Sequence, residues 1–308
     1  MATKSMQEIN NEHFNKTAVD YEKMPDVFEM SQKAGNTIVD EFRKSTSDER
    51  VKNAIALDFG VGIGLSGQPV ATAVHHMVGV DAAEGMLKRL HEKLATEPEL
   101  AHLQSKISTV HHLVTAESPL PEPEATKYLT EGKGFDLVFT NFVMHHIDDV
   151  KGTIQTLGGK LLKQDGWLII VDFEDKPGSE SFHHHHHDHA HGHSHGHEHG
   201  RGHGHGEHAH GHAHEHGQAH DHHHHHHEQQ PGHGPSGDHH PIEFTDAKGE
   251  RLEFVAHHHG FKREEAEKWL QEAGLVDIQS AHAFGMERTH PNGKKIWTDV
   301  MMVKGRRP

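Results

Sequence analysis

One stretch near the start of the chain, Ala56 to Gly67, restricts the possible fold more than any other. The apolar run from Ala54 to Leu57 predicts a buried parallel strand. Asp58 and a loop with four glycines follow it, and Gln68 to His76 has the apolar spacing of a helix. Glycine permits sharp turns and close approach of a ligand to the backbone, and the amides at a helix start favour anionic or polar groups. This order of strand, glycine loop and helix is typical of a nucleotide-binding turn.

Two cofactors suit such a turn. Gly62-x-Gly64-x-x-Gly67 matches the dinucleotide fingerprint. Read from Asp58, the pattern is Asp-x-Gly-x-Gly-x-Gly, which resembles motif I of the class I S-adenosylmethionine-dependent methyltransferases. The next short apolar run, Met77 to Val80, predicts a second strand that ends in Asp81. A carboxylate there is placed to accept hydrogen bonds from ribose hydroxyls, which both cofactors have.

Further motifs favour the methyltransferase family. The sequence FDLVFTNFVMHHIDD, residues 135–149, closely resembles motif IV of the ubiquinone-biosynthesis-type methyltransferases. HFNKTAVDY, residues 13–21, is similar to the Phe-Asp-x-x-Ala-x-x-Tyr opening of many small-molecule methyltransferases. A helix over 261–273 and strands over 276–286 and 296–304 match the family's C-terminal hairpin, and a nicotinamide oxidoreductase has neither this ending nor motif IV.

The resemblance covers residues 13–175 and 257–305 and implies an α/β fold. The expected core is a Rossmann-like, seven-stranded class I methyltransferase sheet with an antiparallel C-terminal hairpin. It also implies a division of the chain into N-terminal cap helices (1–47), a cofactor-binding core (48–175), an insertion with a lid (176–256) and a C-terminal helix and hairpin (257–308).

The family pattern assigns candidate site residues. Thr115 stands where relatives often have an acid that meets adenine, and Glu117 is the nearest substitute. The residues implied to bind S-adenosylmethionine are Asp58, Gly60, Gly62, Gly64, Asp81, Ala82, Met86, Ala116, Glu117 and Asn141. Tyr21 and His258 are candidates for contact with the acceptor. The candidate general bases are His145, His146 and His259, because histidine titrates near neutral pH.

The acceptor is predicted to be a small molecule. The Asn/Asp-Pro-Pro-aromatic signature of many amino-group methyltransferases is absent, which favours oxygen, carbon or sulfur as the methylated atom. The formal charge is −16, and it is −10 outside residues 183–240, so a nucleic-acid partner is disfavoured. An RNA or protein methyltransferase remains an alternative. Another is a metal-binding or metal-sensing protein on a degenerate methyltransferase fold.

Histidine dominates one segment of the predicted insertion. Residues 183–240 contain 28 of the 42 histidines and almost no large apolar side chain, so the segment is predicted to be disordered. Neutral imidazole is a good ligand for zinc, nickel and copper. The candidate ligands are the two uninterrupted runs, His183, His184, His185, His186 and His187, and His222, His223, His224, His225, His226 and His227. A passive low-complexity expansion and a pH-responsive loop are the alternatives.

The remaining composition predicts a soluble cytoplasmic protein, with a nuclear location as the alternative. The chain has no cysteine, which excludes disulfides and thiolate metal sites. No apolar run approaches the length that spans a bilayer. The first eleven residues are mostly polar and include the acid Glu8, unlike a signal peptide.

Overall fold

The computed structural model describes residues 4–130, 132–176, 244–290 and 292–308. These residues belong to one compact unit, and the metal-ligand candidates between 183 and 227 lie outside them. Among the described residues, no helix is both long enough and apolar enough to cross a membrane.

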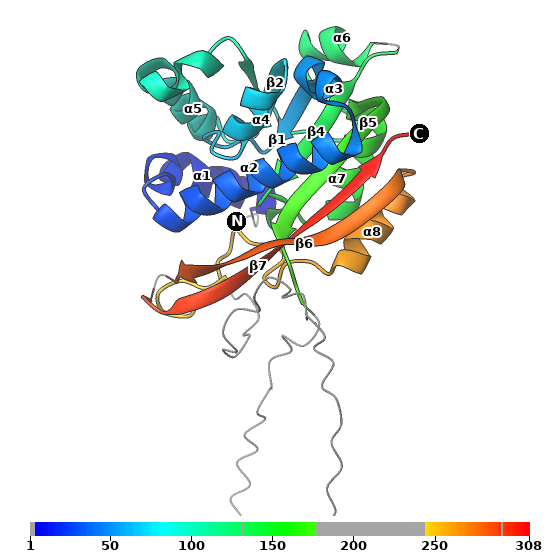
Figure 1. The fold of residues 1–308 in the computed structure, drawn as a ribbon. Helices are drawn as coiled ribbons and strands as arrows, with labels where there is room; N and C mark the ends of the chain where they lie inside the picture. Colours follow the sequence, from blue (N-terminus) through cyan, green and yellow to red (C-terminus); the bar gives the residue numbers. More distant parts are fainter. Residues whose placement is uncertain (1–3, 131, 177–243, 291) are drawn as a thin grey trace, which may run out of the picture. The chain divides into compact units, whose positions relative to one another are not determined.

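A seven-stranded sheet forms the centre of the described unit, in the order β3-β2-β1-β4-β5-β7-β6 (Figure 1). The first five strands run parallel, and β7 pairs antiparallel with both β5 and β6. The predicted class I methyltransferase sheet with its antiparallel C-terminal hairpin is thus confirmed. The strands are β1 (Ile55–Phe59), β2 (His76–Asp81), β3 (Ile107–His111), β4 (Phe135–Asn141), β5 (Leu162–Phe173), β6 (Val276–Thr289) and β7 (Lys295–Arg306).

Helices cover both faces of the sheet, because successive strand residues point to opposite faces and both sets are apolar. Ala56 packs with α2, α4 and α5, whereas its neighbour Leu57 packs with the cluster formed by α7 and α8. The helices are α1 (Met6–Tyr21), α2 (Pro25–Ser45), α3 (Asp48–Asn53), α4 (Gly67–Ala73), α5 (Glu84–Thr96), α6 (Glu124–Leu129), α7 (Val150–Thr156) and α8 (Arg263–Glu272). Short 3-10 turns span Pro98–Leu103 and Met144–His146, and one π turn spans Leu157–Leu161.

The first helix begins well before the sequence motif of residues 13–21. Ser5 and Glu8 form a reciprocal cap: the Glu8 amide donates to the Ser5 hydroxyl, and the Ser5 amide donates to the Glu8 carboxylate at 2.8 Å. The helix therefore starts at Met6. This extra length brings the side chains of the first two turns over the carboxyl ends of the strands.

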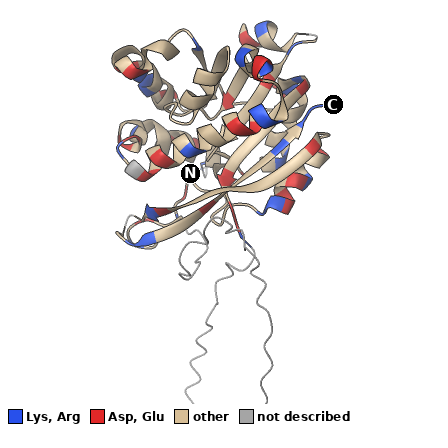
Figure 2. Cartoon of the chain, viewed as in Figure 1, with Lys and Arg blue, Asp and Glu red and all other residues tan. Residues whose placement is uncertain are grey.

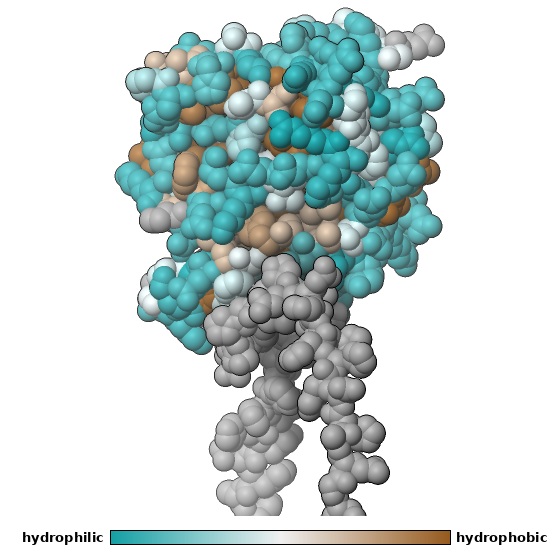
Figure 3. All heavy atoms as spheres, in the orientation of Figure 1, coloured by the Kyte–Doolittle hydropathy of each residue, from teal (hydrophilic) through white to brown (hydrophobic). Residues whose placement is uncertain are grey.

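Charged residues of both signs alternate along the exposed helices in the view of Figure 2. The same view in Figure 3 shows a mainly hydrophilic surface with small apolar areas between helices. This distribution is typical of solvated helix faces.

Candidate active site

The glycine loop between β1 and α4 requires its glycines for two different reasons. Gly60 has φ 75° and Gly62 has φ 53°, which is the left-handed region that side chains disfavour. A Cβ on Gly60 would also lie 2.5 Å from a methyl carbon of Val143, whereas a Cβ on Gly62 would meet nothing within 4 Å. Gly60 is thus needed for packing against the motif IV loop, and Gly62 is needed for its conformation.

Asp81 is held at the end of β2 by backbone amides. One carboxylate oxygen accepts from the Gly62 amide at 2.8 Å, and the other accepts from the Ala83 amide at 2.8 Å. Burial raises the pKa of Asp81, and the backbone hydrogen bonds from Ala83 and Gly62 oppose that effect. The carboxylate is therefore fixed in position with lone pairs left over for a ligand.

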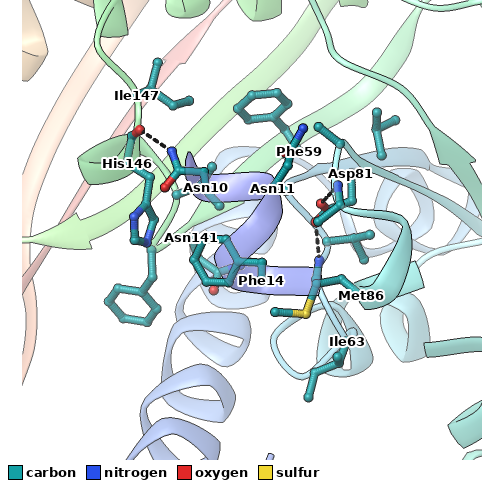
Figure 4. Close-up of a pocket in the computed structure, with 18 of the residues that line it drawn as sticks. Asn10, Asn11, Phe14, Phe59, Ile63, Asp81, Met86, Asn141, His146 and Ile147 are labelled. Carbon is teal, nitrogen blue, oxygen red and sulfur yellow. Dashed lines mark hydrogen bonds between the residues drawn. The ribbon is translucent and has the colours of Figure 1, made fainter. Parts of the chain in front are cut away.

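Asp81 lies on the wall of a cavity of about 960 Å³, open mouth included. Figure 4 shows Asp81, Met86 and Ile63 at one end of the cavity and His146 and Ile147 at the other, with Asn141 between them. Phe14 and Asn10 of α1 lie over the cavity. The cavity sits at the carboxyl ends of the parallel strands, where ligands bind in open α/β sheets.

Of the four residues predicted to surround the adenine, two line the cavity and two do not. Ala82 and Met86 line the cavity. Ala116 and Glu117 are not among its lining residues, because the chain turns away between Thr115 and Ser118, whose backbone and side chain hydrogen-bond to each other. The Ala116 carbonyl instead accepts from the Lys160 ammonium group.

Three residues of the preceding segment, His112, Leu113 and Val114, take that place in the wall. Leu113 is 46% exposed, which is unusual for a large apolar side chain on a short loop. The structure thus offers an apolar surface beside Ala82 and Met86, with His112 at its edge.

Asp58 is fully buried beneath the glycine loop, with neither carboxylate oxygen hydrogen-bonded. A Cβ on Gly67 would lie 2.8 Å from one of these oxygens, so the start of α4 packs directly on the carboxylate. Burial, and next to it the charge of Asp81, raises the pKa of Asp58 well above its usual value. A buried acid without a partner destabilises the protein unless a ligand compensates it.

We therefore expect Asp58→Asn to stabilise the protein at pH 8. A raised folded-state pKa means that stability falls as pH rises from the unfolded value of 3.8 toward the folded value. The neutral amide avoids this loss, and a gain of about 1–3 kcal/mol in the free energy of unfolding is expected. Thermal denaturation at pH 8 and pH 4 measures it, and the difference should vanish at the lower pH. A less stable variant at pH 8 would show that the carboxylate has a stabilising partner.

The segment after β4 is strained beside the cavity. Asn141, 8% exposed, lines the cavity at the end of β4. The next residue, Phe142, has φ 52°, although it is not glycine, and its amide donates to the Val171 carbonyl at 2.9 Å. Backbone strain of this kind clusters at functional sites. The conformation turns the chain so that Asn141, Phe142 and Val143 all face the cavity.

The two motif IV histidines have different environments. His145 is 3% exposed and does not line the cavity; its Nδ1 lies 2.8 Å from the carboxylate of Asp172, which is fully buried. His146 lines the cavity and stacks obliquely on His145, with ring centroids 4.0 Å apart. Only the second histidine of the pair is therefore placed to meet a ligand.

The protonation state of His146 follows from its contacts. Its Nδ1 lies 2.6 Å from the Phe254 carbonyl, which can only accept, so Nδ1 holds the proton. Burial, and next to it the charge of His145, lowers the pKa of His146 well below its usual value. The ring is therefore neutral at neutral pH, with an unprotonated Nε2 that no described residue hydrogen-bonds.

Two segments distant in sequence cover the end of the cavity that His146 lines. The Asn10 side chain of α1 donates to the His146 carbonyl at 2.9 Å, and Phe14 contacts the His146 ring edge-on. Phe254 stacks on His13 with centroids 3.7 Å apart. Residues 244–256 thus pack on α1 and on motif IV, and their only regular pairing is a single antiparallel bridge between Thr245 and Arg251.

The other histidine candidates lie in the loop before α8. His257 donates from Nε2 to the Ile147 carbonyl at 3.0 Å, and its amide donates to the His145 carbonyl. His258 and His259 do not line the cavity formed by the described residues, whereas Tyr21 does. His257 thus supports the motif IV loop from outside. The described residues contain no cluster of three or more histidines, aspartates or glutamates that could hold a metal ion.

Comparison with known proteins shows which proteins this chain is similar to. Residues 57–168 match the model of a methyltransferase domain. An uncharacterized methyltransferase of Mycobacterium bovis is 30% identical over 118 residues, which are 38% of this chain and 49% of that protein. The ubiquinone biosynthesis O-methyltransferase of Pelagibacter ubique is 26% identical over 134 residues, which are 44% of this chain and 48% of that protein. The chain therefore spans about half the length of these curated relatives.

The fold also matches solved structures. The magnesium protoporphyrin IX methyltransferase of Synechocystis PCC 6803, with bound S-adenosylmethionine, aligns over all of both chains with a TM-score of 0.51 and 13% identity. At this identity the likeness concerns the fold alone. Together with the strand order and the domain match, it shows that the described residues have the class I methyltransferase fold and that residues 57–168 resemble a methyltransferase domain.

Proposed function

We propose that this protein transfers the methyl group of S-adenosylmethionine to a small-molecule acceptor, with oxygen, carbon or sulfur as the receiving atom. The observation that supports this most strongly is the amide-fixed carboxylate of Asp81 on the wall of the cavity. Calorimetric titration with S-adenosylhomocysteine tests it, and micromolar binding is expected. Absence of binding to the folded protein would refute the proposal.

The described residues fit this cofactor at three points. Asp81 would accept from the ribose hydroxyls. Ala82, Met86 and the 112–114 segment would enclose the adenine. Gly62, where a Cβ would meet nothing within 4 Å, leaves room for the methionine part. A cationic amino group near the loop would offset the charge of the orphaned Asp58 carboxylate.

When bound, the cofactor supplies an electrophilic methyl group on a sulfonium that is itself the leaving group. The protein's part is to align the acceptor and exclude water. His146 would accept the proton of a hydroxyl or thiol at Nε2, while the Phe254 carbonyl keeps Nδ1 protonated. Asn141, between the two ends of the cavity, would orient the acceptor beside the sulfonium.

We also propose that the histidine runs at 183–187 and 222–227 bind zinc, nickel or copper. The support is their chemistry, since closely spaced neutral imidazoles are good ligands for these ions. The described residues contain no competing cluster.

Replacing residues 183–240 by a short Gly-Ser linker is expected to abolish tight zinc binding. The measurement is calorimetric titration of metal-stripped protein with zinc chloride at pH 7.5. Unchanged affinity for S-adenosylhomocysteine is the control for correct folding of the shortened chain. Zinc binding that survives the deletion would place the ligands elsewhere in the chain.

A further inference from the structure

Asn10 is a buried polar residue on the helix that covers the cavity. It is 7% exposed, and within α1 only Asn10 and Ala18 are buried. Asparagine is mostly exposed in proteins, because a buried amide must replace the hydrogen bonds that it makes with water. Asn10 also lines the cavity, at the end formed by His146 (Figure 4). Both polar atoms of its amide therefore need partners.

One of these two atoms has a partner and the other has none. Nδ2 of Asn10 lies 2.9 Å from the His146 carbonyl, which can only accept, so the nitrogen must face it. This fixes the orientation of the amide and leaves Oδ1 on the other branch. Oδ1 is buried, and no residue in the described part of the chain donates to it. Buried oxygens without a donor are rare and destabilising.

The neighbouring amides of α1 do not supply the missing donor. Gln7, Asn11 and Phe14 line the cavity together with Asn10, because helix positions three and four residues apart share a face. Nε2 of Gln7 donates to Oδ1 of Asn11 at 2.8 Å, so these two amides pair with each other. A ligand in the cavity is left as the source of a hydrogen bond to Asn10.

The Asn10 amide lies beside the proposed base. Its hydrogen bond to the His146 carbonyl holds it against the residue whose ring lines the same end of the cavity. Nε2 of His146 is unprotonated, so this nitrogen and Oδ1 of Asn10 both accept hydrogen bonds. A carboxylate has no proton to donate to either atom, whereas a neutral hydroxyl can donate to each. The nearby wall includes the aromatic rings of Phe14 and Phe142.

We propose that Asn10 accepts a hydrogen bond from the methyl acceptor, so that the preferred acceptor is a neutral molecule with a hydroxyl in addition to the group that is methylated. This inference rests on the proposed methyltransferase function and specifies its substrate class. The group to be methylated would donate to Nε2 of His146, and the second hydroxyl would donate to Oδ1 of Asn10. The apolar body of the acceptor would lie against Phe14 and Phe142. Asn10 thus determines specificity and takes no part in the transfer.

The test compares phenols that differ only in the second donor. The ortho, meta and para dihydroxybenzenes are each titrated by calorimetry against the matching fluorophenol, at neutral pH and with saturating S-adenosylhomocysteine. Fluorine is close to a hydroxyl in size but cannot donate a hydrogen bond. The intact chain is expected to bind at least one dihydroxybenzene roughly tenfold more tightly than its fluorophenol, because the fluorophenol leaves Oδ1 of Asn10 unpaired.

Three variants separate the acceptor atom from the anchoring of α1. Asn10→Leu removes the oxygen together with the hydrogen bond to His146, and should bring the two affinities within about twofold of each other. Asn10→Asp loses the same amide donor but keeps an acceptor oxygen, and should retain the preference. Asn15→Leu is the matched control, because Asn15 accepts from the Gly85 amide at 2.7 Å, anchors the same helix and does not line the cavity. It should leave the ratio of affinities unchanged.

The ratio of affinities decides the outcome, and binding of S-adenosylhomocysteine by each variant is the control for folding. If Asn10 only holds α1 in place, Asn10→Leu will weaken both compounds alike and keep the ratio, which would overturn the inference. Equal binding of every pair, or binding of none of the phenols, by intact protein that binds S-adenosylhomocysteine would overturn it too. Failure of the intact protein to bind S-adenosylhomocysteine would instead refute the proposed function itself.

Discussion

Replacing Asp81 by alanine is expected to weaken binding of S-adenosylhomocysteine roughly a hundredfold or more. The carboxylate would accept two hydrogen bonds from the ribose, and hydrogen bonds to charged groups contribute about 1.5–3 kcal/mol each. The substitution also frees the amides of Gly62 and Ala83, which Asp81 orders before any ligand binds. Isothermal titration calorimetry at constant pH measures the change in dissociation constant.

The pH dependence of the same binding gives an independent check. The pKa of Asp81 is raised by burial, so its ionised form, which accepts hydrogen bonds, is lost at a higher pH than for an ordinary aspartate. Affinity should therefore be constant at neutral pH and fall as pH decreases through this raised value. Glu84→Gln, an acidic change at the exposed start of α5, is the matched control. A variant Asp81→Ala that binds as tightly as the original would refute the assignment of the ribose site.

Replacing His146 by asparagine is expected to lower kcat roughly 10²–10⁴-fold for an acceptor that must lose a proton. An asparagine amide can still donate to the Phe254 carbonyl, as Nδ1 does now, so the packing of residues 244–256 is preserved. What is removed is Nε2, the unprotonated nitrogen on the cavity side. Initial rates at saturating cofactor, measured by formation of S-adenosylhomocysteine, give the effect.

The pH–rate profile of the unmodified enzyme should show the lowered pKa of His146. A base acts only when unprotonated, so the rate should rise with pH only in acid, well below the usual histidine range, and be flat through neutrality. His112→Asn is the matched control, because His112 also lines the cavity but at the adenine end, where Nε2 donates to the Ser118 carbonyl. This control variant should bind the cofactor more weakly and leave kcat at saturating cofactor nearly unchanged. A similar fall in kcat for both variants would argue against His146 as the base.

The arrangement of the glycine loop and Asp81 at one edge of the sheet was predictable from the sequence. Asp58, Gly60, Gly62 and Asp81 lie within 24 residues on two adjacent parallel strands and the loop between them. Parallel strands place their carboxyl ends at one edge, so local pattern alone brings these residues together. The C-terminal hairpin was predicted for the same reason, since alternation and a turn signal are local features.

Ala116 and Glu117 show where a family pattern fails to predict which residues face the cavity. The family pattern places an acid and its neighbours beside adenine, but here Thr115 and Ser118 close a tight turn that directs the chain outward. A short hydrogen-bonded turn changes which residues face the cavity without changing the spacing along the chain. Leu113 and Val114 therefore meet the cavity in their place.

The acceptor half depended on contacts between distant segments. The sequence suggested both motif IV histidines as bases, and only tertiary packing distinguishes them: Asp172, 27 residues on, holds His145 in the core, while Phe254, 108 residues on, fixes the tautomer of His146.

The sequence by itself therefore determined the fold class, the glycine loop and the acid at the end of the second strand, because these follow from the periodicity and turn chemistry of short segments. Tertiary structure decided which polar side chains are exposed to the cavity, which are buried in pairs and which are left without a partner. Burial and pairing set protonation and binding capacity, and both depend on contacts separated by more than a hundred residues.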